Sequence, residues 1–191
     1  MDKLTLVAED LARKFRSDKD YSMSEPIIVK TLLTKLHIFT MYKPLSENAY
    51  GLSTCSADKK DKFILVNSET SKGRQHFTIA HELYHLYLDE NPHPHICRKD
   101  GKKDKAEIMA DAFASALLLP MEGVLKTIPN KEITSRNVSL ATVFSLEQYF
   151  RVSHQCVLYR LKHLGLITEE ELQSMLKIKI REVAPQYGIF D

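Results

Sequence analysis

The residues with the clearest chemical potential are two histidines four positions apart, His81 and His85, with Glu82 directly after the first. On an α-helix, positions i and i+4 lie on one face, with their Cβ atoms about 5–6 Å apart. Two imidazoles placed in this way bind a single zinc ion at about 2.0–2.1 Å. Glu82 lies beside the pair, where its carboxylate can hold a zinc-bound water molecule. This turn of helix therefore predicts a metal site that combines a Lewis acid with a base.

A catalytic zinc site has three protein ligands and leaves one position open for water. The next helical segment carries Glu107 and, four residues later on the same face, Asp111. We predict that Glu107 completes the set of metal ligands. Asp111 lies one turn further along, where it can accept the other ring N–H of a ligand histidine and fix its tautomer.

The elements that must position these residues follow from the spacing of apolar side chains. Short stretches at 37–42, 49–55 and 62–67 are rich in β-branched and aromatic residues and are separated by turns, which predicts a small antiparallel sheet. Pro26 suits the first turn of a helix. Apolar residues at helical spacing predict further helices at about residues 3–16, 73–89, 105–119, 138–150, 154–164 and 168–178. Residues 91–104 are predicted to form a polar loop.

Two motifs give the chain a resemblance to a known family. The pattern RxxFTIAHExxH covers residues 74–85, and the pattern ExxADxFAxxLLLP covers residues 107–120. Together they resemble the ImmA/IrrE family of metallo-endopeptidases, and the similarity extends over about residues 25–125.

The resemblance implies a zincin-like fold that binds zinc through His81, His85 and Glu107, with Glu82 as the general base. It also implies that the strand at about residues 62–68 lines the substrate cleft. Members of this family typically cut repressor proteins of the helix-turn-helix kind, in mobile elements or stress responses. A repressor or antitoxin-like regulator is therefore the protein substrate that the resemblance implies.

Helices that flank one small sheet, followed by a helical C-terminal part, indicate an α+β protein. Combined with the resemblance, this predicts a zincin-like core whose small, mainly antiparallel sheet packs on helices, with a C-terminal part similar to a helix-turn-helix. The expected organisation is an N-terminal helix (1–24), a metallopeptidase domain (25–130), a helical C-terminal region (131–183) and a tail (184–191).

A second group of metal-binding residue types consists of His93, His95 and Cys97. Their short spacing suits a metal, but the neighbouring prolines and the lysine-rich stretch that follows disfavour a fixed geometry. We interpret this segment as a loop at the rim of the active site.

Residues 140–167 resemble two helices joined by a turn, as in DNA-binding helix-turn-helix units. Arg151, Arg160 and Lys162 against Glu147 give this segment a small positive charge, which is little for neutralising phosphates. A helical scaffold or protein-docking surface is therefore favoured over contact with DNA.

Two further residues of this helical segment, Tyr149 and His154, are candidates for an oxyanion donor that reaches into the cleft. Each side chain carries a group that can donate a hydrogen bond to a developing negative charge. The sequence does not choose between them.

The composition of the whole chain narrows the class of protein. The 191 residues include 27 basic and 25 acidic residues, so the formal charge of +2 gives no argument for binding nucleic acid or membranes. The three cysteines lack C-x-x-C spacing, and the N-terminus lacks the pattern of a secretory signal. We expect a cytoplasmic zinc endopeptidase. The alternatives are a regulatory DNA- or repressor-binding protein with a structural metal site, and one half of a toxin–antitoxin pair.

Overall fold

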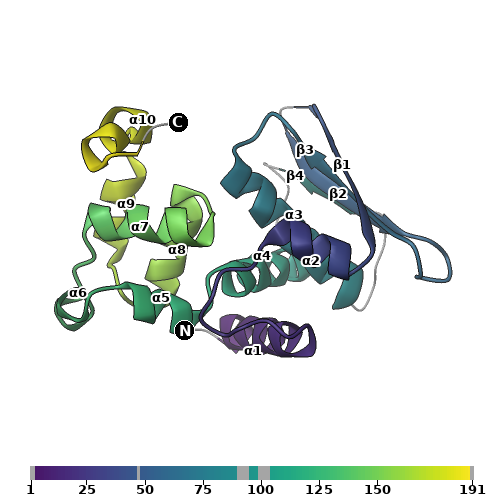
Figure 1. The fold of residues 1–191 in the computed structure, drawn as a ribbon, viewed down its shortest axis with the longest axis horizontal. Helices are drawn as coiled ribbons and strands as arrows, with labels where there is room; N and C mark the ends of the chain where they lie inside the picture. The colour runs from purple at the N-terminus through teal and green to yellow at the C-terminus, as the bar shows by residue number, and fades with distance from the viewer. Residues whose placement is uncertain (1–2, 47, 90–94, 99–103, 190–191) are drawn as a thin grey trace.

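The computed structural model describes residues 3–46, 48–89, 95–98 and 104–189, and within 95–98 the only side chain described is that of Cys97. A small sheet, three long helices and one short helix form one half of the molecule, and a group of further helices forms the other half (Figure 1). The elements of the first half are α1 (Lys3–Asp18), α2 (Val29–Lys35), β1 (Ile38–Lys43), β2 (Ala49–Cys55), β3 (Lys62–Asn67), α3 (Lys72–Tyr87), β4 (His95–Arg98) and α4 (Lys105–Leu118).

As far as residue 189, the last one described, the second half consists of helices alone (Figure 1). Its elements are α5 (Met121–Thr127), α6 (Asn130–Ser135), α7 (Leu140–Phe150), α8 (His154–His163), α9 (Glu169–Leu176), α10 (Ile180–Val183) and a short 3-10 helix (Ala184–Tyr187). The predicted α+β class is confirmed. Within the described residues no single helix is long and apolar enough to cross a membrane, and α4 and α5 meet that test only together, as a pair bent by 47°.

The sheet has the strand order β1-β3-β2-β4. Strand β2 pairs antiparallel with both β3 and β4, whereas β1 pairs parallel with β3. The mainly antiparallel sheet predicted from the sequence is therefore confirmed, and one of its three pairings is parallel. The reason is topological, because β3 returns between β1 and β2 and so runs in the direction of β1.

Two local predictions are corrected by the structure. Helix α2 begins at Val29 rather than at Pro26, because the preceding segment is held against α1, where Arg16 donates hydrogen bonds to the carbonyls of Ser22 and Glu25. The segment predicted as a polar loop contains β4, a four-residue strand at the edge of the sheet. A strand this short has too few residues for an alternating pattern to show.

The core of the first half lies between α1, α3 and α4. Phe15 of α1 packs edge-to-face on Phe113 of α4, with ring centroids 5.7 Å apart. Arg16 is buried and donates two hydrogen bonds, of 2.9 and 2.7 Å, to the carbonyl oxygen of Leu117. These contacts fix α4 against α1 and leave its opposite face for α3.

The two halves are joined by polar contacts as well as by a continuous apolar core. Arg160 of α8 is 1% exposed, donates a 2.7 Å hydrogen bond to the carbonyl oxygen of Leu119 and forms an ion pair with Glu9 of α1. At the other end of the interface, His76 of α3 hydrogen-bonds the carbonyl oxygen of Arg151 at 2.8 Å. The turn between α7 and α8 is thereby held against the start of α3.

Candidate metal centre

Helix α3 carries the two histidines and the glutamate of the first motif. It begins at an N-cap serine, Ser71, whose side chain accepts a hydrogen bond from the backbone N–H of Arg74. All three of His81, Glu82 and His85 are buried, because the helix lies between the sheet and α4. The polar face of the helix is therefore enclosed within the protein rather than exposed to solvent.

The three predicted ligands converge on one point. The Nε2 atoms of His81 and His85 are 3.3 Å apart, and the carboxylate oxygens of Glu107 lie 3.6 Å from the first and 3.3 Å from the second. Two nitrogens bound at about 2.0–2.1 Å to a tetrahedral zinc ion would be about 3.3 Å apart. The spacing of the donor atoms therefore fits a single zinc-sized ion.

The other ring nitrogen of each histidine is paired with a carboxylate. His81 Nδ1 lies 2.9 Å from Asp111 on α4, and His85 Nδ1 lies 2.9 Å from Asp89, just after α3. These contacts place the ring hydrogens on Nδ1 and make both Nε2 atoms electron-pair donors. The carboxylate of Glu107 also donates electron pairs. All three groups that converge here are therefore electron-pair donors, and a bound cation would stabilise them.

Asp111 lies where the sequence placed it, beside His81, one of the predicted ligand histidines. Asp89 was not predicted, although its position four residues after His85 on the same helical face was a usable signal. The two histidines thus have equivalent partners, one from the next long helix and one from the end of their own helix.

Glu82 is fully buried and accepts a 2.5 Å hydrogen bond from the hydroxyl of Ser53 on β2. Ser53 is itself buried, so this contact holds the carboxylate in one orientation. Ser53 was not predicted, because it lies on a strand, outside both helical motifs. A serine at an inward-facing position of a predicted strand was the available signal.

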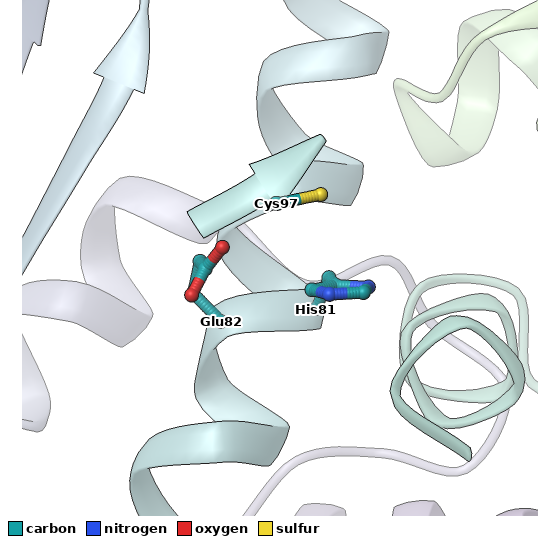
Figure 2. A group of neighbouring side chains, drawn as sticks. All are labelled: His81, Glu82 and Cys97. Atoms are coloured by element: carbon teal, nitrogen blue, oxygen red, sulfur yellow. The ribbon is translucent and has the colours of Figure 1, made fainter. Parts of the chain in front are cut away.

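Cys97 of β4 lies above α3, close to the first motif (Figure 2). Its Sγ, a ring nitrogen of His81 and a carboxylate oxygen of Glu82 all lie within 4.8 Å of one another. Burial raises the pKa of the Cys97 thiol, and the negative charges of Glu82 and Glu107 raise it further. Without a nearby cation this sulfur therefore remains a neutral thiol.

A glycine explains how close β4 comes to the helix. Gly51 of β2 is the residue opposite Cys97 across the pairing of β2 with β4. A Cβ atom at position 51 would lie only 2.6 Å from the side chain of Thr78 on α3. The absence of a side chain lets the sheet approach α3 and brings Cys97 over His81 and Glu82.

A cavity of about 1000 Å³ borders the metal centre. The hydroxyl of Ser115 in its wall is buried and has no hydrogen-bond partner among the described residues. The metal centre lines one side of the cavity and α8 lines the other side. The cavity therefore lies between the two halves of the molecule. The lining includes His81, Glu107 and Asp111 on the first side, and Gln155, Tyr159 and His163 on the second.

The two candidates for an oxyanion donor lie elsewhere. His154 contacts Glu147 and the carbonyl oxygen of Met175, and Tyr149 donates a hydrogen bond to Glu25. Neither residue is among those that line the cavity. The side chains of Tyr159 and His163, neither of which was predicted as a donor, line it instead.

The strand expected to line the cleft is also different. No residue of β3 lines the cavity; among the described residues, the strand residues that line it are Tyr50 of β2 and Cys97 of β4. The reason is the strand order, since β3 lies inside the sheet and β4 forms its edge beside α3. Of the group formed by His93, His95 and Cys97, His93 and the side chain of His95 lie outside the described residues.

Comparisons with known proteins agree with this geometry. The chain matches the Peptidase_M78 family, described as the IrrE N-terminal-like domain, over residues 33–162. It is also 26% identical over 134 residues to "Uncharacterized immunity region protein 2" of Bacillus phage phi105, an alignment that covers 68% of this chain and 76% of the phage protein. The matched family region contains both motifs and all the residues that converge on the metal centre. The chain therefore belongs to the Peptidase_M78 family of metallopeptidases.

Proposed function

We propose that this protein is a zinc-dependent endopeptidase in which His81, His85 and Glu107 bind the metal and Glu82 is the general base. The observation that carries the proposal is the convergence of the three donor groups at 3.3–3.6 Å from one another beside a large cavity. Structural zinc sites are closed by four protein ligands, whereas catalytic sites have three and an open position. Three convergent donors next to a cavity correspond to the catalytic type.

Zinc is the proposed metal because two imidazoles and one carboxylate form a common ligand set of zinc hydrolases. Manganese, iron and cobalt accept the same donors, so the metal must be identified by analysis of the purified protein. A divalent ion in this position supplies a Lewis acid that polarises a peptide carbonyl and lowers the pKa of water.

The residues of the chain then have separate tasks in hydrolysis. Glu82, held by Ser53, takes a proton from the attacking water and passes it to the amine that leaves when the C–N bond breaks. Asp111 and Asp89 hold the rings of His81 and His85 in the orientation that directs Nε2 to the metal. The cavity beside these groups gives room for a segment of peptide.

The proposed substrate is a helix-turn-helix repressor or a similar regulator. The support for this class is the family resemblance, together with a relative that is named for a phage immunity region. A role in DNA binding has less support. Arg160 is buried in an ion pair, and Gln155, Tyr159 and His163 of α8 line the cavity.

The experiment that tests this function is incubation of the purified chain with the repressor encoded beside its gene, with and without a metal chelator. We expect mass spectrometry to show two repressor fragments from one defined cleavage, and the fragments to disappear when the chelator is present. Zinc added in excess of the chelator restores cleavage if zinc is the metal. An intact repressor under all conditions contradicts the proposed substrate, and cleavage that survives the chelator contradicts the proposed chemistry.

A further inference from the structure

We propose that Arg74 determines substrate specificity by binding a carboxylate of the peptide, about three residues from the bond that is cut. The proposal rests on the proposed function, because it assumes that a peptide in the cavity is hydrolysed at the metal centre. It adds to that function the chemical class of one substrate residue. The support comes from the position of Arg74 in the cavity, from the contacts that hold its side chain and from the charges around it.

Arg74 lies on the same face of α3 as His81, at the other end of a stripe of residues that line the cavity. The stripe consists of Arg74, Phe77, Thr78 and His81. The seven positions from Arg74 to His81 make almost two full turns of helix and advance it by about 10 Å. Arg74 therefore borders the same cavity as the metal centre, but at a distance from the metal-binding atoms.

The side chain of Arg74 is held from both halves of the molecule. Its guanidinium carbon lies 4.9 Å from the ring centre of Tyr50 on β2 and 5.8 Å from that of Phe77. From the second half, Gln155 of α8 accepts a 2.9 Å hydrogen bond from Nη2 of Arg74. An arginine side chain has five N–H donors, and stacking on aromatic rings does not use them. The guanidinium is thereby fixed in place while donors remain for a ligand.

A glycine explains how this contact between the two halves forms. A Cβ atom at Gly73 would lie 2.4 Å from the backbone nitrogen of Ser153 and 2.5 Å from the carbonyl carbon of Val152. The absence of a side chain lets the start of α3 touch the turn before α8. This close approach places Gln155 beside Arg74.

The charges that line the cavity give Arg74 no carboxylate partner. Glu107 and Asp111 contact His81 at the metal centre, and no carboxylate in the described part of the chain forms an ion pair with Arg74. Lys3, which also lines the cavity, is exposed, whereas Arg74 is partly buried. A bound anion stabilises a partly buried guanidinium, and a carboxylate matches its planar fork with two parallel hydrogen bonds.

The chemistry of a peptide limits what this anion is. The negative groups of an unmodified protein substrate are the side chains of aspartate and glutamate and the C-terminal carboxylate. An extended peptide advances about 3.3 Å per residue, so the distance along α3 from His81 to Arg74 corresponds to about three residues. We therefore expect an acidic side chain about two to four residues from the bond that is cut.

The test compares peptides that differ by a single charge. A library of random peptides with amidated C-termini is incubated with the full-length, zinc-loaded chain, and the cuts are mapped by mass spectrometry. We expect an excess of aspartate or glutamate at one position about three residues from the cut. For the best sequence, kcat/KM of the glutamate peptide should exceed that of the matched glutamine peptide at least about tenfold, as expected for a hydrogen bond between charged groups. This comparison uses the wild-type chain, so it does not depend on a variant that folds.

Variants then assign the preference to Arg74. Arg74→Gln should reduce the ratio between the two peptides to about one, and Arg74→Lys, which keeps the charge without the planar fork, should retain part of it. Lys72→Gln is the matched control, because it removes an exposed cation of the same helix that does not line the cavity, and it should keep the full ratio. A purely structural role of Arg74 would lower the cleavage of both peptides alike and leave their ratio unchanged.

The outcomes separate this inference from the proposed function. Equal cleavage of the two peptides by the wild-type chain, or a preference that persists in Arg74→Gln, overturns the role of Arg74 and leaves the peptidase proposal intact. A second library with free C-termini distinguishes the sources of the carboxylate. Cleavage of that library alone, lost in Arg74→Gln, supports the carboxylate site and identifies the C-terminal carboxylate as its ligand. A chain that cuts no peptide of either library contradicts the proposed function itself.

Discussion

The α3–α4 metal centre and the α7–α8 helix pair both stand out in the sequence, but the structure gives them different kinds of surroundings. At the metal centre, polar side chains face one another at 2.9–3.6 Å and border a cavity. In the helix pair, the inward faces are apolar and the one buried cation, Arg160, is paired with Glu9. The first region is built to present reactive groups, and the second is built to pack.

The difference shows what a local motif can and cannot determine. The pair His81 and His85 is brought together by the geometry of one helix, whatever the rest of the chain does. The function of a helix-turn-helix depends instead on which face of its second helix remains exposed. Here the turn at Arg151 is held by His76 of α3. The face of α8 that carries Gln155, Tyr159 and His163 lines the cavity.

The largest expected effect is the loss of metal from the first region. His81→Ala and Glu107→Ala each remove one of the three proposed ligands, so elemental analysis should show clear loss of the metal, which we expect the wild-type chain to hold at about one ion per molecule. His154→Ala, a substitution in the second region, is the control and should keep the metal. Full occupancy in both ligand variants would refute the ligand assignment and remove the contrast between the two regions.

The next effect concerns stability in the second region. Arg160→Ala leaves Glu9 without its buried partner, and breaking a buried ion pair costs about 3–5 kcal/mol in the free energy of unfolding. Lys162→Ala removes a largely exposed ion pair with Glu169 and should leave the free energy of unfolding almost unchanged. Both values are measured by denaturant unfolding. Equal stability of the two variants would mean that Arg160 does not join the halves.

The same contrast between the two regions determines which features could be predicted from the sequence. His81, Glu82, His85 and the partner Asp111 follow from spacings within helices, and the structure brings them together with Glu107. Ser53, Cys97 and the cavity-lining side of α8 depend on how separate elements pack, which no local pattern encodes. The parallel pairing of β1 with β3 and the position of β4 at the edge escaped prediction for the same reason.

A smaller effect is expected from the carboxylates that orient the two histidines. Asp111→Ala and Asp89→Ala each remove the acceptor of a ring N–H, and the loss of such a partner typically lowers metal affinity or activity about 10–100-fold. Metal affinity is measured by competition with a chromophoric chelator, with the exposed Asp58→Ala as the control. Unchanged affinity and turnover in either variant would show that its carboxylate does not support the metal site.

The measurement that tests the central claim most directly is repressor cleavage by Glu82→Gln, followed beside derepression of a reporter in cells. Glutamine keeps the size of the side chain and removes its basicity, so the variant should bind metal normally and cleave at least about a hundredfold more slowly, within the range expected for a positioned general base. Derepression should fall in parallel. Derepression at the wild-type level without cleavage would contradict the account, because binding alone would then explain the activity of this chain.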